Sequence, residues 1–221
     1  MKNILSSAVL CLIVCQMQAQ KIIEKHIDFS QKKSVSLNIQ IADSIRIITW
    51  NKNEVYVKAS VNINDNKDNE VFKMTFDQSA DDIDVDARFV MDRNTNCCSY
   101  SKNDCCNCNC KSEIFCEVYI PENVDFSAES ISGNIIISGK TARIRAHSIS
   151  GFIDLAVSPG RPADVKMNTI SGRMYSDFEF QSDARMRRNG GNSIQTQVNG
   201  GGGQPIDIET ISGDIYFRKA Q

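Results

Sequence analysis

Six of the nine cysteines of this 221-residue chain lie in one short segment and are the side chains best suited to chemistry: Cys97, Cys98, Cys105, Cys106, Cys108 and Cys110. Grouped thiols form disulfides in an oxidising compartment or, as thiolates, bind Zn²⁺ or Cu⁺. The two vicinal pairs match no common zinc spacing, and both histidines, His26 and His147, are distant in sequence. We therefore expect disulfides, with a metal site at these thiols as the alternative.

The pairing of the cysteines depends on a predicted hairpin. Apolar residues alternate with polar ones before and after the cysteine segment, and a register with Phe89 opposite Ile114 and Ala87 opposite Cys116 puts every apolar side chain on one face. Cys116 then becomes a buried free thiol. The same register predicts three disulfides: Cys97–Cys106, Cys98–Cys105 and, from the thiols left over, Cys108–Cys110.

Carboxylates offer a second kind of chemistry. Asp82, Asp84 and Asp86 alternate along one predicted strand and share its outer face, where they would bind Ca²⁺, act on glycans or simply be solvated. The solvated face is the favoured interpretation, because one strand seldom completes a calcium shell. A polysaccharide-active enzyme would instead use a strip formed by four residues: Glu129, Arg145, His147 and Lys166.

Other catalytic patterns are missing from the sequence. No serine lies in a nucleophile-elbow pattern, and the Asn199 to Gly203 segment lacks the ending of a phosphate-binding loop. We predict a protein that is not an enzyme, without catalytic residues or a cofactor. Outward-facing Phe152, Tyr175 and Tyr216 would suit sugar stacking, but we expect them to be scattered.

The first twenty residues predict a cleaved signal peptide. Lys2 precedes the apolar run from Ile4 to Cys15, and Ala19 is a suitable cleavage position. Without Lys2 the chain has 24 basic residues against 27 acidic ones, a balance that does not favour nucleic acid. No later segment is long and apolar enough to span a membrane. We expect export to the periplasm, the cell surface or the medium.

The mature chain, residues 21–221, is predicted to form one elongated β domain in three regions. Period-two alternation indicates strands in a 21–70 β region. The cysteine-tipped hairpin occupies 71–121, and repeats occupy 122–221. Four copies of Ile-Ser-Gly define these repeats, and their corner glycines are Gly133, Gly151, Gly172 and Gly213.

The repeats predict a stack of coils of about 20 residues, each a strand, a corner and a second strand. Counted from each glycine, apolar residues recur at seven, five and two positions before and two and four after, and we expect these columns to face the interior. Glycine is expected at the corner because a sharp bend needs its conformational freedom. A degenerate copy between Arg185 and Gly203, with Ile194 and Val198 inside, would fill the longest gap.

These coils, the Val198 to Gly202 segment and the Ile45 to Trp50 strand together resemble the putative adhesin family of exported bacterial β-helical proteins, over roughly 29–218. The resemblance implies an all-β solenoid that presents a surface for adhesion or for an envelope partner. The ligand would be a glycan or a protein on the envelope or on a host surface. No catalytic residues come with the family. The alternatives are a polysaccharide-active β-helix enzyme and an envelope metal-binding protein that uses the cysteines.

Overall fold

The computed structural model describes residues 20–30, 32–90, 111–180 and 191–220, together with the backbone course of 185–187. In these ranges the chain consists of strands and one 3₁₀ turn, Asn69–Val71. The predicted all-β class is confirmed. The leader and the six clustered cysteines lie outside the described residues, so the signal peptide, the disulfides and the alternative metal site stay predictions.

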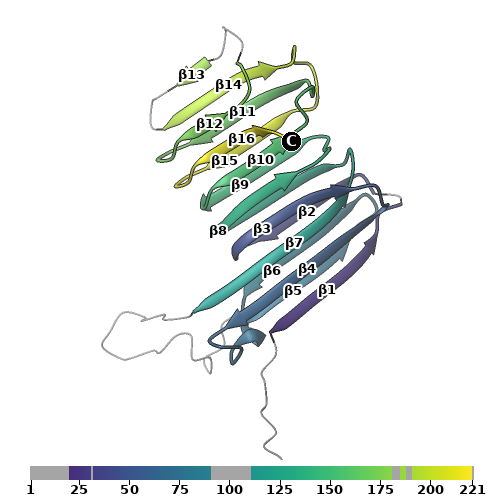
Figure 1. Cartoon of the computed structure of the whole chain (residues 1–221). Coiled ribbons are helices and arrows are strands. Elements are labelled where there is room, and N and C mark those ends of the chain that lie inside the picture. Colours follow the sequence, from purple (N-terminus) through teal and green to yellow (C-terminus); the bar gives the residue numbers. More distant parts are fainter. Residues whose placement is uncertain (1–19, 31, 91–110, 181–184, 188–190, 221) are drawn as a thin grey trace, which may run out of the picture.

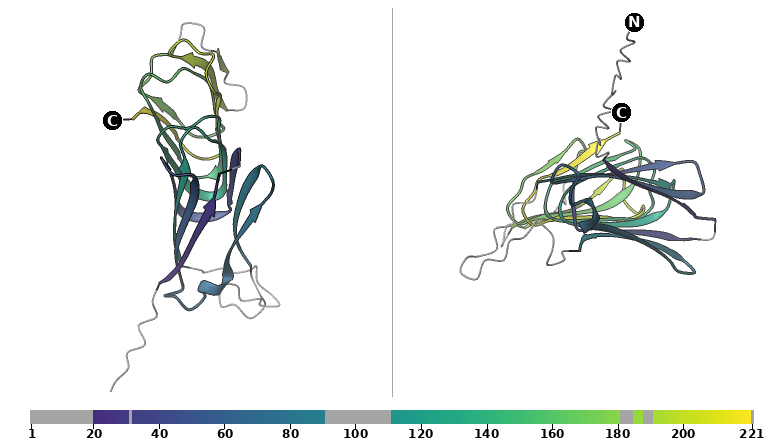
Figure 2. Two further views of the ribbon diagram at one scale, coloured as in Figure 1. Left: turned by 90° about the vertical axis from the view of Figure 1, so that its right-hand side faces the viewer. Right: turned by 90° about the horizontal axis from the view of Figure 1, so that it is seen from below.

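The strands form two facing layers that share one long strand, β8 (Asp125–Ser138) (Figure 1). The first half of β8 pairs with β2 and β9, and its second half pairs with β3 and β10. The change of layer falls at Ser132 and Gly133. Strand β8 thus joins the sixteen strands of the described residues into one hydrogen-bonded sheet that is folded over a common core (Figure 2).

Layer A contains, in spatial order, β1 (Lys21–Asp28), β4 (Glu54–Ile63), β7 (Ser112–Pro121), β3 (Ile41–Trp50), the second half of β8, β10 (Ile153–Val157), β16 (Ile215–Lys219) and β12 (Met174–Ser176). Layer B contains β5 (Phe72–Gln78), β6 (Asp82–Phe89), β2 (Ser34–Ile39), the first half of β8, β9 (Ile144–Ser150), β15 (Ile206–Thr210), β11 (Ala163–Thr169), β14 (Asn192–Val198) and β13 (Arg185–Arg187).

Four of the five predicted repeat columns are confirmed, because equivalent residues are strand partners. Ile144 lies opposite both Phe126 and Ile206, and Ile153 opposite both Ile135 and Ile215. The apolar members of these columns are almost all fully buried between the layers. Each such side chain contributes about 1.5–3 kcal/mol relative to exposure.

The fifth column, the isoleucine of Ile-Ser-Gly itself, faces solvent, contrary to the prediction. These isoleucines expose 38–58% of their surface: Ile131, Ile149, Ile170 and Ile211. The residue before each one, a serine or threonine, is buried in its place. Buried and exposed residues alternate as far as that serine or threonine. The next two residues, the isoleucine and serine of the motif, both face outward, so the alternation resumes after the corner with a shift of one residue.

The corner glycines are required by the neighbouring repeat rather than by their own backbone angles. None of the four has a positive φ. A Cβ on Gly151 would overlap the carbonyl of Gly133, and the same holds for Gly213 against Gly151 and Gly172 against Gly213. Only glycine lets successive corners approach this closely, so the expected reason for glycine was wrong.

The spatial order of the repeats differs from their order in sequence. Strands β15 and β16, the last in the chain, lie between β9/β10 and β11/β12 (Figure 1). The degenerate fifth coil does not form, because β14 runs antiparallel to β11, although Val198 is buried as expected. The mixed strand orientations and this insertion distinguish the fold from a regular β-helix.

The predicted 71–121 hairpin is also wrong in its pairing. Strand β6 pairs with β5 and β2, whereas β7 pairs with β4 and β3. Alternation fixes which face of a strand is buried, but it leaves the partner strand open. The tight Ser79–Asp82 connection makes β5 the local partner of β6, since the backbone amide of Asp82 donates to Ser79 Oγ at 3.0 Å.

Candidate functional site

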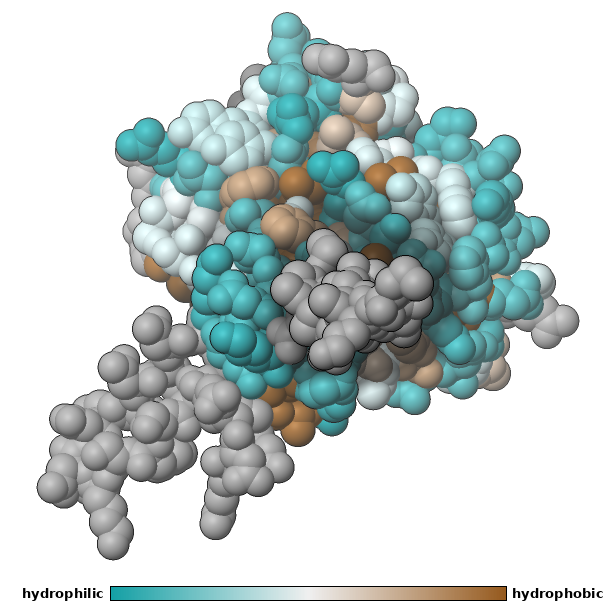
Figure 3. All heavy atoms as spheres, turned by 60° about the horizontal axis from the view of Figure 1, so that its bottom comes forward, coloured by the Kyte–Doolittle hydropathy of each residue, from teal (hydrophilic) through white to brown (hydrophobic). Residues whose placement is uncertain are grey.

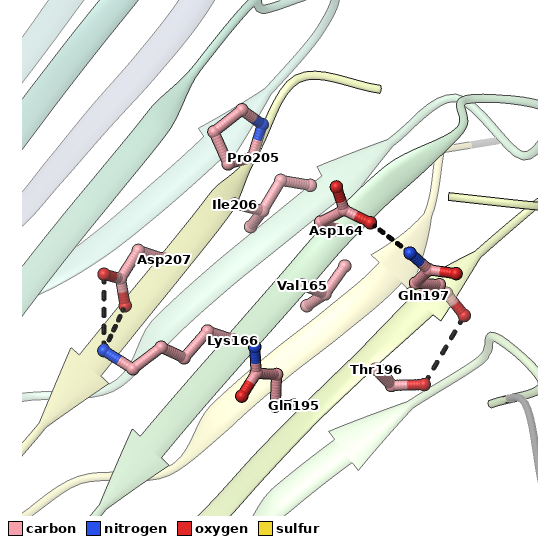
Figure 4. Close-up of a pocket in the computed structure, with 9 residues that line it drawn as sticks. All are labelled: Asp164, Val165, Lys166, Gln195, Thr196, Gln197, Pro205, Ile206 and Asp207. Carbon is pink, nitrogen blue, oxygen red and sulfur yellow. Dashed lines mark hydrogen bonds and ion pairs between the residues drawn. The ribbon is translucent and has the colours of Figure 1, made fainter. Parts of the chain in front are cut away.

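A shallow polar groove crosses the outer face of β11, β14 and β15 (Figure 4). Its volume is about 540 Å³, and its polar walls come from Asp164, Lys166, Gln195, Gln197 and Asp207. These side chains are neighbours because alternate residues of adjacent strands project from the same face. The size is in the range of small-ligand sites.

Four of the five polar wall residues of the groove are paired with one another. Lys166 Nζ donates to Asp207 Oδ1 at 3.4 Å, and Gln197 Nε2 donates to Asp164 Oδ1 at 2.8 Å. The backbone amide of Gly202 also donates to Asp164, at 3.3 Å. With one lysine and two paired carboxylates, this groove offers hydrogen bonds to a hydroxylated ligand but no activated nucleophile.

An aromatic patch lies on the outer face of layer A and consists of Phe152, Tyr175 and Tyr216. The Tyr175 and Tyr216 rings stack at a centroid distance of 5.1 Å and an angle of 8°, and Phe152 meets Tyr216 edge-on at 5.9 Å. The expectation that these rings are scattered is therefore wrong. They converge because β16, from the end of the chain, lies between β10 and β12.

Tyr175 leaves ring surface free. It is 42% exposed, and β12 is the last strand of layer A among the described residues. Arg173 lies beside it, and a hydrogen bond from Arg173 to Tyr175 raises the pKa of the guanidinium. Tyr216 Oη donates to Asp214 Oδ2 at 3.4 Å. Desolvation, followed by the Asp214 charge, raises the pKa of Tyr216, so this phenol stays neutral at physiological pH.

A second aromatic group, which the sequence analysis missed, lies across β1, β4, β7 and β3. The Tyr119 ring is 5.1 Å from Trp50 and 5.8 Å from Tyr56, and His26 lies 4.5 Å from Tyr56. Lys52 Nζ covers the Trp50 ring at 4.4 Å. In the sequence these aromatic residues occupy outward positions of separate predicted strands. Only the pairing of those strands brings the rings together.

The predicted enzyme strip is contiguous on the outer face of layer B. Glu129 and Glu209 both lie opposite His147, and Arg145 and Lys166 both lie opposite Asp207. Both glutamates are exposed, as is Arg145, and the strip lies on a sheet face rather than in an enclosed cavity. The strip gains Glu209, a residue that the sequence analysis did not include.

The three outward aspartates do project from one face of β6, as predicted. Ser34 Oγ donates to Asp82, and Asn38 Nδ2 donates to Asp86 at 2.9 Å. Within the described ranges, no group of three or more His, Cys, Asp or Glu side chains is placed to hold a metal ion. Among the same residues, none forms a helix suited to crossing a bilayer.

Cys116 is a buried free thiol, which confirms the prediction. Burial raises its pKa to about 12. Its backbone neighbours are Ala59 and Ile45 rather than Ala87. A neutral thiol in this position packs as a small apolar side chain and is not a reactive group.

The described residues that are visible at the end where β1 and β5 lie are coloured by hydropathy in Figure 3. Figure 3 shows a mostly hydrophilic surface there, with small separate hydrophobic patches. Among the described residues, the exposed large apolar side chains include Ile22 of β1 and Phe115 of β7. The two strongest candidates for ligand contact are therefore the aromatic patch and the polar groove.

Comparison with solved structures identifies the kind of fold. A putative cell adhesion protein from Clostridium sporogenes aligns with 91% of this chain and 100% of its own, at a TM-score of 0.57 and 11% identity. A putative adhesin from Bacteroides fragilis covers 92% and 99% at a TM-score of 0.33 and 8% identity. No family model and no curated protein matches the sequence. The chain thus has an adhesin-like fold.

Proposed function

We propose that this protein is an exported, non-catalytic, adhesin-like β-solenoid that binds a glycan on the cell envelope or on a host surface. The repeats supply a stiff body, because each unit hydrogen-bonds to its neighbours through parallel strands. The adhesion name of the Clostridium sporogenes neighbour agrees with this role, although fold alone does not establish function.

The observation that carries the proposal is the free face of the stacked Tyr175–Tyr216 pair. The negative face of an aromatic ring attracts the weakly positive C–H groups of a sugar ring, as it attracts the edges of other rings. Arg173 and Asp214 border the two tyrosines and offer a hydrogen-bond donor and an acceptor to sugar hydroxyls. Charges of both signs side by side favour a neutral ligand.

Immobilised panels of bacterial and host glycans would test this function. We expect the mature protein to retain a subset of them and Tyr175→Ala to weaken that binding about 5- to 150-fold, if stacking of a sugar on one ring contributes about as much as stacking of a nucleobase, about 1–3 kcal/mol. Tyr175 is exposed, so the variant should keep its fold. Phe115→Ala, on the same layer and 49% exposed, is the matched control and should bind as the parent does.

An absence of any retained glycan, or equal loss in the Tyr175→Ala and Phe115→Ala variants, would contradict the proposal.

The enzyme alternative rests on the adjacent Glu129, His147 and Glu209. The same panel distinguishes this alternative from glycan binding. Turnover of a polysaccharide by the parent protein, and its loss in His147→Ala, would favour catalysis. Stoichiometric zinc or copper in native material would favour the metal-binding alternative.

A further inference from the structure

The last unit of the chain is held in place from both sides by segments that are remote in sequence. This C-terminal unit consists of β15, the corner Ile211–Asp214 and β16. Strand β15 pairs with β9 and β11, and β16 pairs with β10 and β12. Its sequence neighbour β14 lies on the far side of β11. The unit therefore occupies a slot whose walls are built by residues 144–176.

The slot recognises a pattern that every repeat shares. On the β15 side its walls present Ile144, Ala146, Val165 and Met167, and Ile206 and Ile208 complete the same columns. The buried hydroxyl of Thr210 donates to the carbonyl of Gly151 at 3.2 Å, and that of Thr169 donates to Gly213 at 3.0 Å. Two exposed ion pairs cross the walls, Lys166–Asp207 and Arg218–Asp154. No contact depends on the unit belonging to the same chain.

A single glycine-rich linker, Asn199–Gly203, leads to the unit. Four consecutive residues have positive φ, from 51° at Asn199 to 91° at Gly200, and a Cβ on Gly200 or Gly202 would meet nothing within 4 Å. Four hydrogen bonds hold this turn: Asn199 Nδ2 donates to the carbonyls of Pro159 at 2.8 Å and Arg161 at 2.7 Å, and the amides of Gly201 and Gly202 donate to the Val198 carbonyl at 3.1 Å and to Asp164 Oδ1 at 3.3 Å. Opening the linker costs these hydrogen bonds and almost no apolar burial.

We propose that the C-terminal unit is exchangeable, and that the slot of one molecule accepts the C-terminal unit of a second copy of this chain. An element that one glycine-rich linker joins to the preceding strand is of the kind that domain swapping exchanges, and the exchanged dimer makes the same contacts as the monomer. Closure within one chain competes at an effective concentration in the millimolar range. Exchange is thus a minor state in dilute solution and grows where copies are concentrated.

Co-refolding of isotopically light and heavy mature chains, followed by native mass spectrometry, tests this exchange. In an equimolar mixture at about 50 μM chain we expect roughly 5% exchanged dimer, about half of it mixed, in proportion to the ratio of chain to effective concentration. Tenfold more chain should raise this fraction severalfold. Exchanged dimers should persist for hours after dilution, since separation requires unfolding of the unit.

The linker supplies the matched pair of variants. Deletion of Asn199–Gly203 leaves Gln204 and Pro205 between Val198 and Ile206. The three Cα–Cα steps that join Val198 to Ile206 then reach about 10 Å, barely the two strand spacings between β14 and β15 of about 9.5 Å. The shortened linker is then too short to cross the start of β11 and reach β15 of the same molecule. This variant should therefore be mostly dimeric. Insertion of five Gly/Ser residues should leave the dimer as scarce as in the parent.

Absence of mixed dimer from the parent chain at about 500 μM would overturn the proposal, whether or not the deletion variant folds. Dimers that form equally in the deletion and insertion variants, or that dissociate within minutes of dilution, would also overturn it, because they would use another surface. A folded, mostly dimeric deletion variant supports exchange. The result is independent of glycan binding, which the Tyr175→Ala variant tests separately.

Discussion

Two isoleucines of one repeat have opposite roles although they are four residues apart. Ile211 belongs to the Ile-Ser-Gly motif and is 38% exposed, whereas Ile215 is fully buried in the columns between the layers. A motif residue that recurs in every repeat is thus not always a core residue. The buried residue of the motif is the threonine or serine before it, whose hydroxyl bonds to a neighbouring corner in three of the four repeats.

Replacement of these isoleucines should have unequal effects on stability. We expect Ile215→Ala to lower the free energy of unfolding by about 2–5 kcal/mol, because it removes buried contacts and leaves a cavity. Ile211→Ala should cost less than about 1 kcal/mol. Urea denaturation of both variants measures the difference, and equal losses would contradict the exposed position of Ile211.

The buried thiol of Cys116 predicts a loss of stability at high pH. Its pKa is about 12 in the folded protein, against an ordinary value of 9.0. Above pH 9 the unfolded chain releases this proton while the folded chain retains it, so stability is full below pH 9 and falls as pH rises toward 12. The slope approaches about 1.4 kcal/mol per pH unit.

Comparison with Cys116→Ala isolates this contribution. Urea denaturation at pH 8, 9.5 and 10.5 should show a smaller decline for the alanine variant than for the parent. Parallel declines would mean that Cys116 does not titrate differently in the two states. The same variant should leave glycan binding unchanged, because Cys116 is buried on β7, which pairs with β4 and β3 and not with the strands that bear the aromatic patch.

At the scale of the elements, the corners decide how closely repeats approach. The carbonyls of three corner glycines, Gly133, Gly151 and Gly213, each occupy the position that a Cβ on the spatially next corner glycine would need. Strand pairing at a spacing of about 4.8 Å then continues through the bend from one layer to the other. The glycines are therefore packing residues between units.

Gly151→Ala tests this role, with Gly160→Ala as its control. A methyl group at position 151 meets the rigid backbone of Gly133, so we expect a loss of about 1–3 kcal/mol from overpacking. A Cβ at position 160 meets nothing within 4 Å, and that variant should be nearly neutral or slightly stabilised. Thermal unfolding compares the two, and an unaffected Gly151→Ala would show that the corners can separate.

At the scale of the whole molecule, the inserted C-terminal unit makes the repeats that contain β9, β10, β11 and β12 depend on one another. Strands β9 and β11 both lose a complete edge of hydrogen bonds if β15 is absent. The pairs that close the slot join residues about 40 to 60 positions apart, as between Ile144 and Ile206. Such non-local pairing slows folding, because loop-closure entropy must be overcome before the contacts form.

Pulse-labelling hydrogen exchange during refolding should reveal this interdependence. We expect the amides of β15 and the facing amides of β11 to gain protection together, after those of the local hairpin β5–β6. The pair β5–β6 serves as the internal reference, since its partners are close in sequence and it does not pair with the C-terminal unit. Protection of the β11 amides facing β15 well before those of β15 would show that the slot forms empty and closes without its unit.

The sequence by itself determined the strand content, the buried side of almost every strand and the columns of equivalent residues, because period-two alternation and repeat spacing are local properties. Tertiary structure decided the partners: β6 with β5 rather than β7, β14 antiparallel to β11, and the last unit between earlier ones. It also assembled the aromatic patch from three separate strands. Alternation specifies which face is buried, whereas partner choice depends on competition among chemically similar edges, and only the complete fold resolves that competition.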